Sequence, residues 1–165
     1  MWGEAYLEQA RSDWQVWQII HQYGLPSCHE LHYLQMACEK LGKAFLLIGG
    51  TILPEKAQSS HLAFKRFLQV ASRNPELRTL LKMRASQFKL HIKQLLPIAE
   101  SIERLTPALA QDGPNVEYPW AAPDRTVIVP ANYNFSEFRE LRRPAGVNLL
   151  KLIDLVQEKS YRLFT

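Results

Sequence analysis

Arg84 and His91 are polar residues on the otherwise apolar face of a predicted helix, and their side-chain types suit chemistry on a phosphate ester. An imidazole titrates near neutrality, so His91 suits the transfer of a proton to or from a hydroxyl group. The guanidinium fork of Arg84 suits the stabilisation of negative charge on a phosphate. The two residues therefore form a candidate catalytic pair. The same side chains also fit two other roles, holding a ligand without catalysis or supporting the fold.

The pair is expected on one long helix. The run Asn-Pro-Glu at 74–76 is typical of a helix start, because Asn caps, Pro fits the first turn and Glu favours the positive end of the helix. The apolar pattern then continues to about Leu105. At about 100° per residue, Arg84 and His91 lie within about 60° of Phe88, the centre of the apolar face. A buried Arg needs internal acceptors, or else a bound phosphate in a cleft or at a dimer interface.

Positive charge is concentrated between residues 61 and 99. This segment has eight Lys and Arg residues and one acidic residue, whereas the rest of the chain has 12 basic and 15 acidic residues. Four of the cations are predicted to form one exposed stripe on the long helix: Arg78, Lys82, Lys89 and Lys93. Such a stripe suits a nucleic-acid backbone, and the alternative is a solvated surface that keeps the protein soluble. The stripe lies more than about 100° around the helix from Arg84 and His91, so one substrate would have to wrap the helix to reach both sets.

Other residues make weaker candidates. Cys28 and His32 share a helix face, but no further ligand is near enough in the sequence to complete a metal site, so no metal is predicted. The sequence has no Gly-rich phosphate loop, Ser-His-Asp arrangement or paired-carboxylate motif, and no cofactor is expected. Two cysteines, no secretory signal and no membrane-spanning run predict reduced thiols in a cytoplasmic protein without membrane contact.

The hydrophobic pattern predicts an all-α protein of one domain, residues 1–165, built as an up-down bundle of four to five helices. The clearest helix spans about 27–48, with Ser27 as its expected cap and glycines 49 and 50 at its end. Its apolar residues alternate in steps of three and four: Leu31, Leu34, Cys38, Leu41, Phe45 and Ile48.

The remaining elements follow from the same pattern. A first helix is predicted over 4–22, a linker over 49–60, a third helix over 61–72 and the long helix over 74–105. An irregular, proline-rich loop is expected over about 107–135, with a short extended piece at 126–129. Helical pattern resumes near Ser136 and is interrupted or restarted at Pro144.

Four segments resemble the HEPN family of small helical bundles. The run Ala-Cys-Glu-Lys-Leu-Gly-Lys-Ala-Phe-Leu-Leu at 37–47 is similar to the second helix of that family, and residues 5–14 are similar to its first. Ser-His-Leu at 60–62 resembles the Thr-His-x-Leu that commonly opens the third helix. The segment 116–120 is similar to the Arg-Tyr-Pro of many small members, with Glu117 in the place of that Arg.

The resemblance implies either a metal-independent ribonuclease or a binding partner without that activity. Residues 84–91 have the spacing of the family's Arg-x(4–6)-His motif, with Ala85 where the family usually has Asn, Asp or His. We therefore expect a homodimeric accessory module that binds RNA or a nucleotide, beside a nucleotidyltransferase or antitoxin partner. The alternatives are a toxin-like ribonuclease that uses Arg84 and His91, and a purely structural dimerisation domain.

Overall fold

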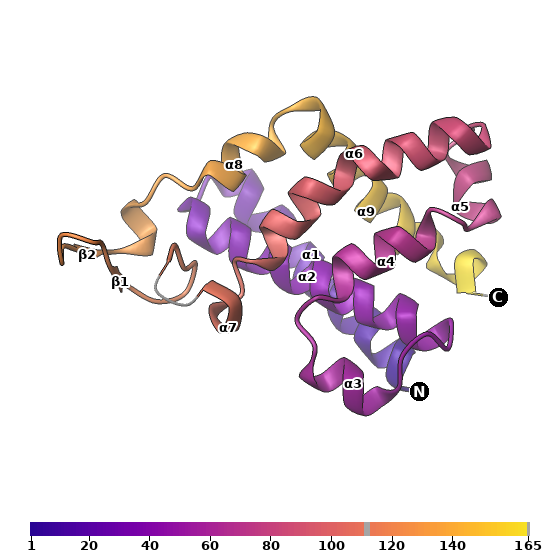
Figure 1. The fold of residues 1–165 in the computed structure, drawn as a ribbon, viewed down its shortest axis with the longest axis horizontal. Coiled ribbons are helices and arrows are strands. Elements are labelled where there is room, and N and C mark those ends of the chain that lie inside the picture. Colours follow the sequence, from indigo (N-terminus) through magenta and orange to yellow (C-terminus); the bar gives the residue numbers. More distant parts are fainter. Residues whose placement is uncertain (111–112, 165) are drawn as a thin grey trace.

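The computed structural model describes residues 1–110 and 113–164, and it shows an all-α helical bundle (Figure 1). Its long helices are α1 (Trp2–Tyr23), α2 (Ser27–Ile48), α6 (Ala85–Glu103) and α9 (Pro144–Phe164). Its shorter helices are α3 (Pro54–Ser59), α4 (Ala63–Ala71), α5 (Pro75–Leu80), α7 (Pro107–Ala110) and α8 (Ser136–Leu141). The predicted all-α class is confirmed.

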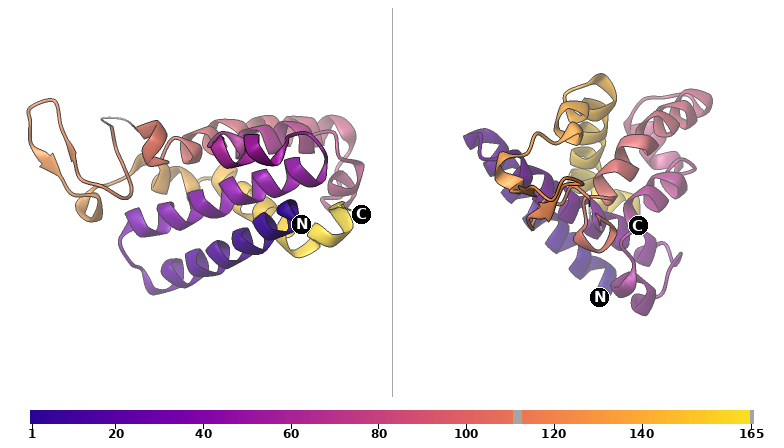
Figure 2. Two further views of the ribbon diagram at one scale, coloured as in Figure 1. Left: turned by 90° about the horizontal axis from the view of Figure 1, so that it is seen from below. Right: turned by 60° about the vertical axis from the view of Figure 1, so that its left-hand side comes forward.

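The first two helices form an antiparallel hairpin and lie side by side along their length (Figure 2). Gly24 ends α1 in the left-handed conformation with φ 63°, which an L side chain adopts only at a cost. The predicted bounds of α2 are confirmed, but its expected cap is wrong, because Pro26 and not Ser27 is the N-cap residue. At the other end only Gly50, and not Gly49, has a positive φ.

The core is built around α2, which contacts α1, α4, α6 and α9. The predicted stripe of α2 is buried from Leu31 to Phe45, and Ile48 at its end is partly exposed. Cys28 and Cys38 are free, buried thiols that act as small apolar residues. The other helices add side chains that are at most 1% exposed: Ala10, Phe64, Phe67, Leu68, Leu77, Phe88, Ile92, Leu95, Leu149, Leu152 and Val156.

The predicted long helix over 74–105 is wrong, because the chain turns between α5 and α6. Helix α5 ends at Leu80, Lys82 takes a positive φ of 53°, and α6 begins only at Ala85. In Figure 1, α5 makes the corner between α4 and α6. After the turn, α5 packs against α9. Leu77 on α5 is thereby fully buried.

The segments expected to be irregular contain short elements. The predicted linker 49–60 holds α3, and the third helix begins later than predicted, at Ala63, with Leu62 left 56% exposed. In the proline-rich loop, β1 (Trp120–Ala121) pairs antiparallel with β2 (Val127–Ile128), which confirms the extended piece predicted there. A 3-10 turn, Pro130–Asn132, follows. Residues 111–112 of this loop lie outside the described part of the chain.

Candidate functional site: a basic cluster at the ends of three helices

Three of the four predicted cations lie where the ends of α4, α5 and α6 come together. Arg78 on α5 and Lys89 on α6 border a hollow of about 240 Å³, and so does Arg73, which follows the end of α4. Arg73 and Lys89 also border a second hollow of about 330 Å³, whose rim includes Lys93. We call Arg73, Arg78, Lys89 and Lys93 the basic cluster. The fourth predicted cation, Lys82, lies in the turn between α5 and α6 and borders neither hollow.

Local sequence explains how the basic cluster is held. The N–H of Leu77 donates to Oδ1 of Asn74 at 2.9 Å, and Pro75 occupies the first helical position, so α5 starts directly after the turn that contains Arg73. On α6, Lys89 and Lys93 are one turn apart, about 6 Å along the axis. Their neighbours Phe88 and Ile92 are buried, which fixes the rotation of α6 and leaves both lysines exposed.

The charge of the basic cluster is not compensated within the part of the chain that the structure describes. None of its four side chains takes part in an ion pair there. Lys65 on α4 differs, because its Nζ lies 2.6 Å from Oε2 of Glu100. Guanidinium and ammonium groups gathered around a concave surface without carboxylates attract anions, and phosphate groups suit both. The arrangement can therefore bind phosphate.

Arg73 is the member of the basic cluster that the predicted stripe did not include. The count of charges between residues 61 and 99 contains it, but stripe geometry applies only within one helix. Arg73 comes just after α4, whereas the predicted stripe lies on the next helix. The tertiary contact between α4 and α6 brings it beside Lys89.

The structure does not place Arg84 on the buried face of a helix, and that prediction is wrong. Arg84 is the exposed N-cap residue of α6, and its backbone N–H donates to Oε1 of Gln87 at 3.1 Å. His91 lies two turns further along α6, about 10 Å away along the axis, and is partly buried. Neither residue lines the two hollows of the basic cluster. Arg84 therefore needs no internal acceptor, because water solvates its charge.

Burial lowers the pKa of His91 below its ordinary value of 6.5, so the folded protein favours the neutral imidazole. The unfolded chain then binds this proton more readily, and stability is lost as the pH falls through 6.5. We expect wild type to lose more stability than His91→Gln over this pH change, in urea unfolding followed by circular dichroism. The other four histidines are present in both proteins and cancel in the comparison. Parallel pH profiles for the two proteins would contradict the expectation.

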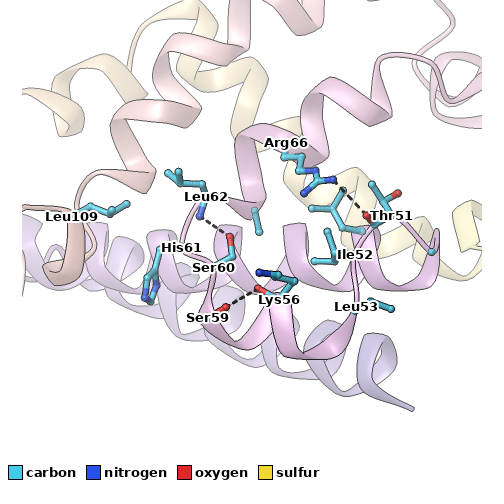
Figure 3. A pocket seen from close by; sticks show the side chains of 13 residues that line it. Thr51, Ile52, Leu53, Lys56, Ser59, Ser60, His61, Leu62, Arg66 and Leu109 are labelled. Atoms are coloured by element: carbon cyan, nitrogen blue, oxygen red, sulfur yellow. Dashed lines mark hydrogen bonds between the residues drawn. The ribbon is translucent and has the colours of Figure 1, made fainter.

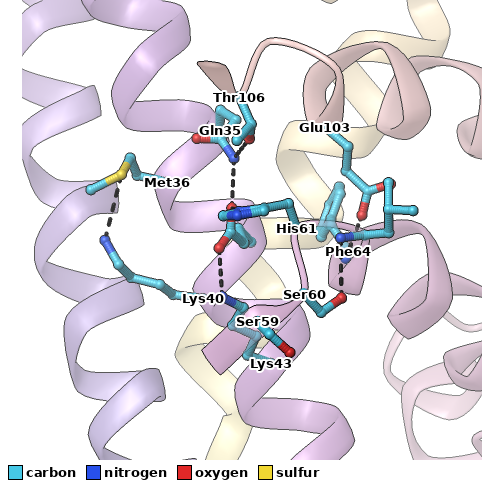
Figure 4. Close-up of polar contacts among 12 residues, drawn as sticks. Gln35, Met36, Lys40, Lys43, Ser59, Ser60, His61, Phe64, Glu103 and Thr106 are labelled. Atoms are coloured by element: carbon cyan, nitrogen blue, oxygen red, sulfur yellow. Dashed lines mark hydrogen bonds and ion pairs between the residues drawn. The ribbon is translucent and has the colours of Figure 1, made fainter. Parts of the chain in front are cut away.

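A cluster of hydrogen-bonded polar side chains lies between α2, His61 and Thr106 (Figure 4). Its centre is the carboxylate of Glu39, which accepts from Lys43 Nζ at 2.6 Å and from Gln35 Nε2 at 2.9 Å. Oε2 of Glu39 also lies 3.3 Å from Nδ1 of His61. Gln35 in turn donates to the hydroxyl of Thr106. These contacts join α2 to the segment before α4 and to the turn between α6 and α7.

The environment of Glu39 favours a structural role. Burial raises the pKa of its carboxyl, but the hydrogen bonds from Lys43 and Gln35 outweigh burial and hold the pKa below the ordinary value. Glu39 is therefore ionised near neutrality, and three donors already surround its two oxygens. The sequence pattern did not indicate this group, because its members come from separate elements and become neighbours only on folding.

Three tryptophans and the metal-ligand candidate His32 occupy structural positions. Trp14 and Trp17 stack in the core with ring centroids 4.3 Å apart, and Trp120 packs against Tyr133. Nδ1 of His32 lies 3.2 Å from Oε1 of Glu117. Within residues 1–110 and 113–164, no three His, Cys, Asp or Glu side chains are grouped so that they could hold a metal ion.

Comparison of the chain with protein-family models, curated proteins and solved structures gives no match. Among the described helices, none combines the length and the apolar character needed to cross a bilayer. The fold and the basic cluster are therefore the observations that bear on function.

Proposed function

We propose that this protein is a HEPN-like accessory module that binds RNA, or a nucleotide, through the phosphate groups of the ligand. The observation that carries the proposal is the basic cluster, four cations that have no carboxylate partner in the described part of the chain and that surround two adjoining hollows. A chain with a net charge of only +4 gains its attraction for a polyanion from this local concentration of charge.

The linings of the two hollows favour RNA recognised by its backbone. Their one aromatic side chain is Phe88, which is 1% exposed and offers no surface on which a base could stack. Two hollows that share Arg73 and Lys89 suit successive phosphates of a strand better than a single nucleotide. We therefore expect binding with little dependence on base sequence.

Binding is favoured over ribonuclease activity by the positions of the residues on α6. By helical geometry His91 lies about 160° or more around the axis from Lys89 and Lys93. An RNA strand on the basic cluster therefore lies on the flank of α6 opposite to His91. Arg84 is a solvated N-cap residue, so it is not held against a scissile phosphate by neighbouring groups.

The proposal includes the assembly that the resemblance implies, a homodimer that works beside a nucleotidyltransferase or an antitoxin. These partners rest on the resemblance alone. The binding of RNA is independent of them and can be measured with the purified chain.

The test is fluorescence anisotropy of a labelled single-stranded RNA over a series of salt concentrations. We expect log K to fall linearly with log salt, and the slope to decrease by about 0.7 for each phosphate contact removed. Arg73→Ala combined with Lys89→Ala should therefore reduce the slope by about 1.4 and weaken binding. The control is Arg139→Ala combined with Lys151→Ala, which removes the same charge from exposed positions on α8 and α9.

Three results would contradict the proposal: no RNA binding, equal losses of RNA affinity in the two double variants, or a salt dependence that neither double variant changes. RNA should stay intact during the titration in the presence of a chelator. Cleavage by wild type that is lost in His91→Ala, with folding retained, would establish the ribonuclease alternative instead.

A further inference from the structure

A pocket of about 700 Å³ lies at the other end of α4, away from the basic cluster (Figure 3). It is enclosed by the end of α2, by α3 and by the start of α4, and Leu109 of α7 borders it. We call it the α3 pocket. Its volume is within the range of small-molecule sites, which is about 300–1,000 Å³.

Among the described residues, the side chains that line the α3 pocket carry positive charge and no negative charge. Lys56 on α3 and Arg66 on α4 both line it, and none of the lining residues is Asp or Glu. Neither cation has an ion-pair partner among the described residues, and Nη2 of Arg66 donates to the backbone carbonyl of Thr51 at 3.4 Å. His61 is also part of the lining, with Nδ1 turned to Glu39. The pocket therefore favours an anionic group.

The apolar part of the lining is aliphatic. It consists of leucine and isoleucine side chains with one alanine, and it includes no aromatic ring: Leu46, Ile52, Leu53, Leu62, Ala63 and Leu109. Leu53 is 68% exposed and Leu62 is 56% exposed, so two large apolar side chains at the pocket are left in contact with water. A flexible hydrocarbon chain covers such a surface more fully than a nucleobase does, because the planar groups available for stacking are only the partly buried imidazole of His61 and the guanidinium of Arg66.

We propose that the α3 pocket binds a small aliphatic anion, with its hydrocarbon chain on the leucines and its carboxylate or phosphate group between Lys56 and Arg66. The hydrophobic contact removes Leu53 and Leu62 from water, and charge-assisted hydrogen bonds orient the anionic end. The site is separate from the basic cluster and does not depend on RNA binding.

The test is isothermal titration calorimetry with decanoate, decyl phosphate, decanol and AMP, each at concentrations at which it is monomeric. We expect saturable binding of decanoate or decyl phosphate, at least about tenfold weaker binding of decanol, and at least about tenfold weaker binding of AMP. The decyl anion that binds more tightly identifies the preferred head group, carboxylate or phosphate. Arg73→Ala, a change in the basic cluster, should leave decanoate and decyl phosphate binding unchanged.

Two variants test the site itself. Lys56→Ala combined with Arg66→Ala removes two exposed cations and should weaken binding of the decyl anion by about tenfold or more. Leu62→Asp replaces an exposed apolar side chain of the lining with a negative charge and should also weaken it. The proposal is overturned by equal binding of decanol, by tighter binding of AMP, by no saturable binding of either decyl anion, or by unchanged affinity in both variants.

Discussion

Gly42→Ala is expected to destabilise the protein by about 3 kcal/mol, the upper end of what one added methyl group costs in a packed core. Gly42 lies in α2, where the start of α4 crosses it. A Cβ atom there would be 2.6 Å from both the carbonyl carbon and the oxygen of Ala63, and 2.8 Å from Cα of Phe64. These are backbone atoms, so no side chain can rotate away and the two helices must separate. Alanine's better helix propensity recovers only about 1 kcal/mol.

Thermal unfolding checks this prediction. Since each kcal/mol shifts Tm by about 2–4 °C in a chain of this size, Gly42→Ala should lower Tm by about 6–12 °C. The matched control is Gly49→Ala at the end of the same helix, where φ is −75° and the nearest atom to a new Cβ is 3.2 Å away. Its Tm should change much less. Equal shifts in both variants would show that α4 does not approach Gly42 closely.

The effect of Gly42→Ala on binding reports the position of α4. Helix α4 positions Arg66 near its start, and Arg73 follows its end, so both proposed sites depend on its packing against α2 and α6. A loss of RNA affinity at a temperature at which Gly42→Ala is folded would therefore report the displacement of α4.

Local pattern was enough to predict the α1–α2 hairpin. Gly24 and Pro26 interrupt two long apolar stripes, and each of these signals acts within a few residues of the chain. The break between α5 and α6 has no such signal. Residues 81–84 contain neither Gly nor Pro, and Lys82 adopts a positive φ although a non-glycine residue is disfavoured there. The turn is stabilised by packing of α5 against α9, which only the folded chain shows.

The difference between local pattern and tertiary packing also explains which parts of the candidate site could be predicted. Lys89 and Lys93 were placed correctly relative to each other because both lie on α6. Arg84 lies outside the predicted apolar face because α6 begins only at Ala85, and Arg73 lies outside the predicted stripe because it follows a different helix. The pairing of Glu39 with His61 and the contact of Glu103 with α4 join residues 22 and 39 positions apart, distances at which sequence periodicity carries no information.

Glu103→Ala is expected to destabilise the protein by about 2–4 kcal/mol. Glu103 on α6 is 1% exposed, and its Oε1 accepts from the backbone N–H groups of Phe64 and Lys65 at 2.7 and 2.9 Å (Figure 4). Helix α4 has no capping side chain of its own, so this distant carboxylate satisfies two of its free N–H groups. Removing it leaves both donors without a partner, at about 1–3 kcal/mol each when buried.

Glu103→Gln separates the hydrogen bonds from the charge. Its side-chain oxygen still accepts from the two N–H groups, so urea unfolding at neutral pH should show a clearly smaller loss than in Glu103→Ala. If Glu103→Gln loses as much stability as Glu103→Ala, the ionised carboxylate itself is needed. Losses near zero in both would mean that water caps α4 equally well.

The pH dependence of stability in wild type and Glu103→Gln tests whether burial raises the pKa of Glu103. Burial raises the pKa of Glu103 above its ordinary value of 4.5, and the hydrogen bonds from Lys65 and Phe64 offset this only in part. The folded protein therefore binds this proton more readily than the unfolded chain, so the protonated state adds stability that is lost as the pH rises through the folded-state pKa. Lowering the pH from neutrality towards 4.5 should thus stabilise wild type relative to Glu103→Gln. If lowering the pH instead destabilises wild type relative to Glu103→Gln, the N–H groups of α4 outweigh burial and lower the pKa of Glu103.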